Sequence, residues 1–132
     1  MSRRELREQI FKLLFRIEFN DETEMPEQIA LFFEGEEPVE DSVREEISRK
    51  YEAVVEKKQQ LDAMLDSKAT GWKVSRMGKV DLTILRLALY EMLFDDEVPV
   101  SVAINEAVEL AKKFGQTESP AFVNGILAKF AN

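Results

Sequence analysis

Cysteine and histidine are both absent from this chain of 132 residues. Without cysteine there is no disulfide framework, no thiol nucleophile and no cysteine-rich zinc site. Without histidine there is no Ser-His-Asp or Cys-His machinery and no imidazole ligand for a metal. Carboxylate catalysis and oxygen-ligated Mg²⁺ stay open, but no glycine-rich phosphate loop or diagnostic carboxylate pair is present. We predict a protein that is not an enzyme, needs no cofactor and binds no metal.

Long apolar runs are absent as well. The N-terminus is charged and amphipathic, unlike a signal peptide, and no stretch approaches the roughly 18 apolar residues of a membrane span. With 45% hydrophobic and 33% charged residues, the chain has enough apolar material for a core. We expect one soluble, cytoplasmic domain over residues 1–132, with no membrane partner.

The charge is uneven along the chain. Eighteen basic residues against 26 acidic ones give a net charge of −8, which taken whole argues against nucleic acid. Residues 2–16 nevertheless hold five basic and two acidic residues, a balance of +3. Residues 17–66 hold five basic and sixteen acidic ones, a balance of −11, and residues 67–132 are neutral. The sequence therefore combines a basic N-terminal arm with an acidic middle segment.

Apolar residues recur at helical spacing along the whole chain, and no segment alternates as a strand does. Residues 82–93 are apolar nearly all round, which is typical of the buried central helix of a bundle. The fold class is therefore all-α, a compact bundle of about seven helices. The expected helices are 3–19, a short one after Pro26, 40–66, one turn within 72–77, one capped by Asp81 that runs to Phe94, one opened by Pro99 and closed by Gly115, and one that follows Ser119 as N-cap and Pro120.

A loop at residues 67–71, which contains Thr70-Gly71, divides the bundle in two. We expect a three-helix N-terminal subdomain, residues 1–67, and a four-helix C-terminal subdomain, residues 68–132. Each is too small for a deep core of its own, so both count as parts of one domain.

The first helix carries a second stripe beside its aliphatic face. Arg4, Arg7, Phe11 and Phe15 fall at i, i+3, i+7 and i+11, and Arg3 and Lys12 flank them. Guanidinium groups contact phosphates, and aromatic rings stack on unpaired bases. This pattern is typical of a single-stranded RNA surface. In the plainer interpretation the arginines are solvated and both phenylalanines pack on a neighbouring helix; a basic amphipathic helix also suits a membrane surface or a partner groove.

Four further features have a structural and a functional interpretation. Trp72 with Arg76 would be a surface site, but a lone tryptophan in a small helical domain is usually core, and we expect core. Asn105-Glu106 is expected at the wet edge of its helix, and the acidic run 95–97 in a solvated turn rather than at a cation. Gly125, inside the last helix, costs up to ~1 kcal/mol relative to alanine; it would allow close packing of helices or close approach of a ligand backbone.

Ordered motifs in the C-terminal half resemble one known family. Residues 72–93 read W-x3-RM-x2-VD-x2-ILRLALYEML, followed by VPVSVAINEAVELAKKFG and SPAFVNGIL. Together with the opening RRELREQIFKLLF, these motifs closely resemble the NusB family of bacterial transcription antitermination factors. The resemblance covers essentially the whole chain and is faint through residues 20–66.

The resemblance implies an all-helical fold of two subdomains and no catalytic activity. It implies binding of the boxA element of nascent RNA, notably in ribosomal RNA leaders, as a heterodimer with NusE. NusE is the small-subunit ribosomal protein that doubles as a transcription factor. The pair would act in the antitermination complex of RNA polymerase. Some family members also form homodimers, so a homodimer is a possible further assembly.

The family's RNA-binding residues map onto two parts of this chain. The arginine-rich first helix corresponds to Arg3, Arg4 and Arg7, with Lys12 beside them, and the family's aromatic, usually tyrosine, corresponds to Phe15, which lacks the hydroxyl. In the last third of the chain the resemblance implies RNA-binding roles for Phe122 of the FVNG motif, for the acidic Glu118 before the last helix, and for Lys112 near the same edge.

The predicted function is therefore transcription antitermination through boxA-type single-stranded RNA, together with NusE. The alternative is a helical protein–protein adaptor that binds no RNA and uses the acidic middle helix as its working surface.

Overall fold

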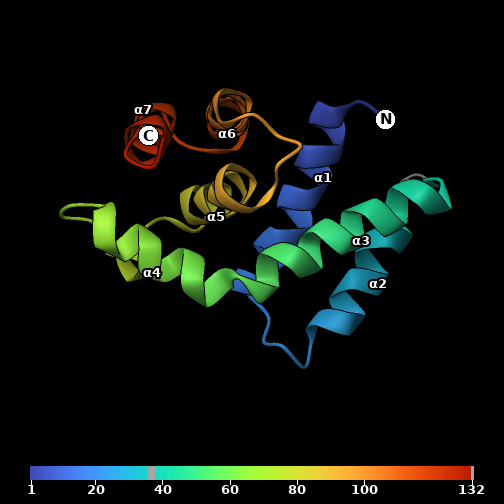
Figure 1. Cartoon of the computed structure of the whole chain (residues 1–132). Coiled ribbons are helices and arrows are strands. Elements are labelled where there is room, and N and C mark those ends of the chain that lie inside the picture. The colour runs from blue at the N-terminus through green and yellow to red at the C-terminus, as the bar shows by residue number, and fades with distance from the viewer. Residues whose placement is uncertain (36–37, 132) are drawn as a thin grey trace. The chain divides into compact units, whose positions relative to one another are not determined.

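A computed structural model describes residues 1–35 and 38–131 (Figure 1), and within these ranges the chain is helical with no strand. The chain divides into two compact units, residues 1–55 and 56–132. The all-α prediction and the expected number of helices are confirmed. The sequence suggested a boundary between two subdomains after residue 67, whereas the contacts divide the chain after residue 55. Residues 56–67 therefore belong to the C-terminal unit.

The N-terminal unit begins with helix α1. It comprises α1 (Arg3–Phe15), the short 3-10 helix η1 (Arg16–Glu18), α2 (Met25–Gly35) and α3 (Asp41–Glu56), whose last residue belongs to the next unit. Apolar residues spaced at three and four positions are buried in each α-helix, as amphipathic helices require. These residues include Ile10, Leu13 and Leu14 of α1, Met25 and Phe32 of α2, and Ile47, Tyr51 and Val54 of α3.

The C-terminal unit is built around a central helix. Its elements are α4 (Lys58–Lys68), the 3-10 helix η2 (Val74–Arg76), α5 (Lys79–Phe94), α6 (Val100–Phe114) and α7 (Ser119–Ala128). In α5 every residue from Leu82 to Leu89 is buried, as the all-round apolar pattern predicted. Helices α5, α6 and α7 pack on one another, and Figure 1 shows them grouped together.

An ion pair between a buried arginine and a partly exposed aspartate joins α4 to α5. Arg86 of α5 is 5% exposed, and its guanidinium donates two hydrogen bonds to the Asp62 carboxylate of α4, at 2.8 and 2.9 Å. This two-pronged geometry satisfies a charge that would be costly to bury alone. Among the described residues no buried side-chain nitrogen or oxygen lacks a hydrogen-bond partner. The ion pair therefore fixes α4 against α5.

The long helix expected over 40–66 is interrupted, which corrects that prediction. Lys57 (φ −95°, ψ 2°) separates α3 from α4. Residues 56–60 are all polar, so no apolar side chain at this point holds the two segments in register. The Lys57 ammonium lies 5.0 Å from the centre of the Phe94 ring, an attraction that favours the break. The first helix likewise ends earlier than expected, at Phe15, and continues as η1.

Two expected N-caps were wrong by one turn or less. Helix α5 begins at Lys79 after Gly78, so Asp81 lies within its first turn. There its negative charge interacts favourably with the positive end of the helix dipole. Helix α7 begins at Ser119 with Glu118 as N-cap residue. The Ser119 hydroxyl instead accepts a hydrogen bond of 2.9 Å from the Gln116 backbone amide, because the side chain is buried against the preceding turn. Pro99 precedes α6 as predicted.

Candidate nucleic-acid interface

A complete capping box fixes the start of α1. The Glu5 backbone amide donates to the Ser2 hydroxyl at 3.0 Å, and the Ser2 backbone amide donates to the Glu5 carboxylate at 3.2 Å. Such reciprocal bonds satisfy two helix-end donors. They also lower the pKa of Glu5, chiefly through the Ser2 backbone amide. Glu5 therefore stays ionised and offsets one positive charge of the arm.

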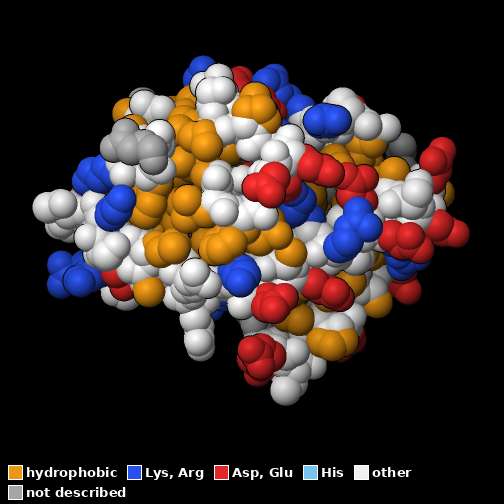
Figure 2. Space-filling view, viewed as in Figure 1, with side chains coloured by type: hydrophobic (Ala, Val, Ile, Leu, Met, Phe, Trp, Pro, Cys, Tyr) orange, Lys and Arg blue, Asp and Glu red, His pale blue; other side chains and the backbone are white. Residues whose placement is uncertain are grey.

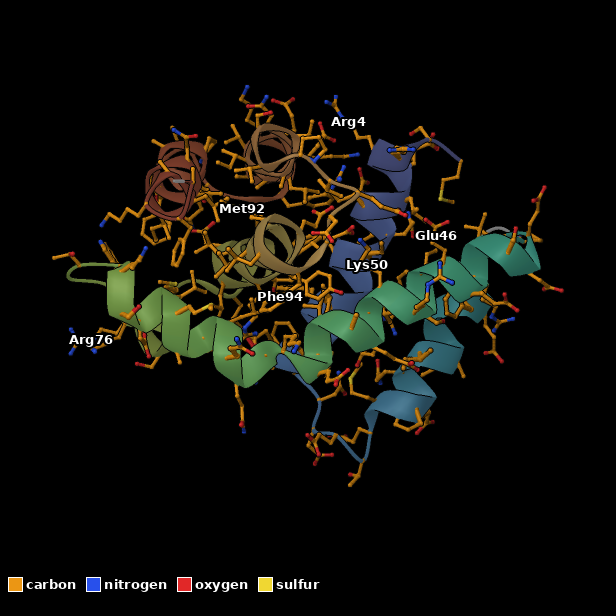
Figure 3. The ribbon with its side chains drawn as sticks, viewed as in Figure 1. Arg4, Glu46, Lys50, Arg76, Met92 and Phe94 are labelled. Atoms are coloured by element: carbon orange, nitrogen blue, oxygen red, sulfur yellow. The ribbon has the colours of Figure 1, made fainter. Side chains whose placement is uncertain are left out.

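The predicted cationic residues all lie on α1 and differ in exposure. Arg3 and Arg4 are exposed, and Arg7 and Lys12 are partly buried. Figure 3 shows the Arg4 side chain pointing away from the α1 ribbon. The Lys12 ammonium lies 3.6 Å from the Glu8 carboxylate one turn earlier. The arm thus presents its positive charge most openly at the beginning of the helix.

Arg16 belongs to the arm by sequence but not by structure. Its guanidinium donates to the Gln28 carbonyl at 3.2 Å and to the Gln28 side-chain oxygen at 3.0 Å, and lies 5.3 Å from the centre of the Phe32 ring. These contacts tie η1 to α2. One of the five positive charges counted in residues 2–16 therefore has a structural role.

The aromatic part of the predicted stripe needs a correction. Phe11 is only 3% exposed, because Ile10, Leu13 and Leu14 beside it are buried too and the second half of α1 lies in the core. Phe15 is half-buried and stacks on Phe11, with ring centres 6.1 Å apart. A helical wheel shows in which direction a side chain points from the helix axis, but not how deeply it is buried. The stripe therefore starts in solvent at Arg4, enters the core at Phe11 and ends half-buried at Phe15.

Phe19 is an exposed aromatic residue that the sequence analysis missed. It is 60% exposed, and its ring meets that of Phe15 edge to face at 5.1 Å. The signal was present in the sequence, since Phe19 continues the spacing of four from Phe11 and Phe15. The aromatic surface of the N-terminal unit consequently extends past the end of α1.

In the C-terminal unit the structure brings two of the three predicted residues together. Glu118 and Phe122 line one cavity of about 780 Å³, beside the junction of α6 and α7. Lys112 is exposed on α6, where its ammonium lies 3.0 Å from Glu109, and it does not line the cavity. The acidic residue and the aromatic residue thus share a site in this unit.

Trp72 is not part of the core, contrary to the expectation. Its side chain is 52% exposed and meets the Phe122 ring edge to face, with centres 5.4 Å apart. Trp72 also lines the same cavity. The core positions of this unit are taken by aliphatic residues of α5, α6 and α7, which leaves the tryptophan on the surface.

Two other minor predictions have clear outcomes. Asn105 is exposed and Glu106 is half-buried, so this pair lies at the wet edge of α6 as expected. Gly125 is exposed, and a β-carbon added there would meet no atom within 4 Å. The glycine therefore does not serve close packing of helices within this chain.

The described residues hold neither a cluster suited to a metal ion nor a helix suited to a membrane. In residues 1–35 and 38–131, no three acidic side chains are grouped so that they could hold a metal ion. Asp95 instead accepts a hydrogen bond from the Glu97 backbone amide at 3.1 Å, which makes a local turn. None of the helices in these ranges is both long and apolar enough to cross a bilayer.

Known proteins share the sequence and the fold of this chain. The model of the NusB family matches residues 4–132. The transcription antitermination protein NusB of Agathobacter rectalis is 53% identical over 131 residues, which cover 99% of this chain and 100% of that protein. A solved NusB of T. maritima, 33% identical, covers 99% of this chain and 91% of its own with a TM-score of 0.86.

A second solved structure supports the fold. It contains antitermination factors NusB and NusE in complex with dsRNA; its matching chain is 22% identical, covers 98% of this chain and 95% of its own, and superposes with a TM-score of 0.85. The relative of Agathobacter rectalis and one of Lachnoclostridium phytofermentans, which is 51% identical over 129 residues, are both transcription antitermination proteins NusB. On the strength of the family match and the relatives that match nearly its full length, the chain belongs to the NusB family.

Proposed function

We propose that this protein is a transcription antitermination factor that binds boxA-type single-stranded RNA together with NusE. It would work in the cytoplasm, within the antitermination complex of RNA polymerase, notably on ribosomal RNA operons. The observation that carries the proposal is the capped helix α1, which holds Arg3 and Arg4 exposed at the start of a basic arm in a chain of this family.

Each proposed residue has a physical role. Arg3, Arg4 and Arg7 neutralise phosphates, with Lys12 as a fourth cation, since guanidinium groups match the geometry of phosphate oxygens. Phe15 and Phe122 provide ring surface on which unpaired bases stack. Glu118 accepts hydrogen bonds from base amino groups, and Lys112 contributes a phosphate contact from α6.

The charge distribution supports dependence on a second protein. Glu45, Glu46 and Glu52 are exposed on α3 and repel polyanions. Figure 2 shows acidic side chains on the surface of the molecule, interspersed with basic ones. Ionised Glu5 further reduces the charge of the arm. RNA affinity without a partner is then weak. NusE is the partner that we propose, because a NusB of this fold has been solved in complex with NusE and dsRNA.

Salt dependence tests the proposal directly. The four cations of the arm alone give a slope of about −3 when the logarithm of the affinity is plotted against the logarithm of salt concentration, since each contact to a single strand contributes roughly −0.7, and the contact of Lys112 makes the slope steeper by about the same amount. The measurement is a titration of labelled boxA RNA with the NusE complex at several salt concentrations. A flat response would exclude phosphate neutralisation by the arm.

Removing two arginines should separate binding from folding. Arg4→Ala with Arg7→Ala is expected to weaken RNA binding about 100-fold or more, because each of the two charge-assisted contacts contributes about 1.5 kcal/mol, or roughly a factor of ten. The melting temperature should stay nearly unchanged. Arg49→Ala, an exposed arginine on α3, is the matched control and should leave binding unchanged. A large loss of stability in the double variant would mean that the two side chains are structural.

The acidic surface of α3 favours one other function, a protein–protein adaptor without RNA. The same titration decides between them. If the complex with NusE binds no RNA while both proteins still associate, the adaptor function is supported. A homodimer, detected by sedimentation of the protein alone, is compatible with either function.

A further inference from the structure

A second basic segment lies far along the chain from the N-terminal arm. Residues 67–80 contain Lys68, Lys73, Arg76 and Lys79 and no acidic residue, and they surround Trp72, the one tryptophan of the protein. This segment connects α4 to α5 through η2. Trp72 is 52% exposed within this run of cations, so packing of the core does not explain its presence there.

The position of Trp72 is fixed by the backbone around it. Gly71 adopts a left-handed conformation (φ 81°) that favours glycine, and the Trp72 amide donates to the Ala69 carbonyl at 2.9 Å. The Asp66 carboxylate accepts a hydrogen bond of 2.7 Å from the Val74 amide. Hydrogen bonds on both sides of the tryptophan therefore hold its segment in place before any ligand arrives.

The surroundings of Trp72 suit a nucleobase. Its ring and that of Phe122 stand at 73° to each other, and both line the cavity of about 780 Å³, with Phe114 as a third aromatic residue. Asp81 and Glu118 also line this cavity, and carboxylates accept hydrogen bonds from the N–H groups of a base edge. The cavity thus combines ring surface for stacking with acceptors for the edge of a base.

The segment of residues 67–80 also carries cations that can contact the phosphates next to a stacked base. Lys73 and Arg76 are exposed, and Figure 3 shows Arg76 pointing away from the ribbon. Lys68 has a structural role instead: its ammonium donates to the Lys129 carbonyl at 3.3 Å and lies 4.9 Å from the centre of the Phe130 ring. Lys79 is exposed as well and lines the cavity itself, while Lys73 and Arg76 are exposed outside the cavity lining, where they can contact the adjoining RNA backbone.

We propose that Trp72 and Phe122 form a stacking site for one unpaired RNA base, with Lys73 and Arg76 on the adjoining phosphates. This proposal rests on the proposed function, because it adds a contact for the same RNA. It assigns to Trp72 a role in binding RNA, where the sequence alone suggested a role in the core.

Tryptophan fluorescence of the full-length protein tests the site directly. Because the chain has a single tryptophan, a base that stacks on Trp72 changes the only indole emission. A titration with unlabelled boxA RNA should change this emission with the same midpoint as the anisotropy of labelled RNA. Unchanged emission at saturating RNA, in a sample whose anisotropy shows binding, would overturn the stacking site and leave the proposed function intact. Absence of binding by anisotropy, with and without NusE, would overturn both.

Variants give a second, independent test. Trp72→Ala should weaken binding about 5- to 100-fold, and Trp72→Phe should retain most of it, because one stacked base is worth that factor and phenylalanine still stacks. Lys73→Gln with Arg76→Gln should make the salt slope less steep by about 1.4, whereas the control Arg49→Gln should not change it. Equal affinity of Trp72→Ala and the unmodified protein would contradict the proposal, and circular dichroism shows that each variant is folded.

Discussion

Replacing Asp62 by alanine is expected to lower the free energy of unfolding by about 3 kcal/mol, the lower end of the cost of removing one partner from a buried ion pair, since the Asp62 side chain is 23% accessible. Arg86 is 5% exposed, and its guanidinium would lose both hydrogen bonds to the carboxylate. The buried cation would then keep its desolvation penalty without that compensation. Urea unfolding monitored by circular dichroism measures the change.

Two further variants make this prediction specific. Glu109→Ala removes a carboxylate from an exposed pair with Lys112, whose side chains are 42% and 60% accessible, and should cost less than about 1 kcal/mol. Asp62→Ala combined with Arg86→Met should recover part of the stability, because methionine leaves no buried charge at position 86. If Asp62→Ala costs no more than Glu109→Ala, the pair does not stabilise the core.

The second large effect is expected at Gly115. A β-carbon there would lie 2.6 Å from both Cβ and Oγ of Ser119 and 2.8 Å from the Ala111 carbonyl oxygen. Because one of these atoms belongs to the backbone of α6, a change of side-chain rotamer cannot relieve the clash. Gly115→Ala should therefore cost about 3 kcal/mol, the upper end of overpacking. It should also displace the start of α7.

Gly125→Ala is the matched control for Gly115. The added methyl group would stand in open space inside α7, so this change should stabilise the protein by up to about 1 kcal/mol. Thermal unfolding of both variants compares them under the same conditions. Equal melting temperatures would show that the junction of α6 and α7 relaxes freely. The φ of Gly115 is −93°, so the requirement for glycine there is one of space and not of backbone conformation.

The helices could be predicted largely because their apolar periodicity is strong. The run from Leu82 to Leu89 identified the central helix, and Pro99 identified the start of α6. The break at Lys57 was not predicted because apolar residues at helical spacing lie on both sides of it, up to Val54 and from Leu61 onward, and suggested one helix across the polar residues 56–60. Helix starts at Asp81 and Ser119 were misplaced since cap preferences act within one turn, where tertiary contacts such as that of the buried Ser119 decide.

The sequence was enough to predict a basic surface on the first helix, but not which of its side chains are exposed or bound to other residues. Charge counting located the arm, but it could not show that Arg16 is bound to Gln28 or that the Lys12 ammonium lies 3.6 Å from the Glu8 carboxylate. Depth of burial separated Phe11, which is in the core, from Phe19, which is in solvent. Trp72 was misjudged because the size of a side chain predicts burial only when the core has room for it.

The paired lysines at the end of α4 and the end of α7 have a consequence for folding kinetics. Lys68 and Lys129 each donate to the other's backbone carbonyl, although 61 residues separate them. The contacts of α5 with α6 and of α6 with α7 join neighbours along the chain, which close small loops and form early. The lysine pair closes a long loop at a greater entropic cost. We therefore expect this contact to form in the last steps of folding, so that Lys129→Met would speed unfolding more than it slows folding in stopped-flow measurements.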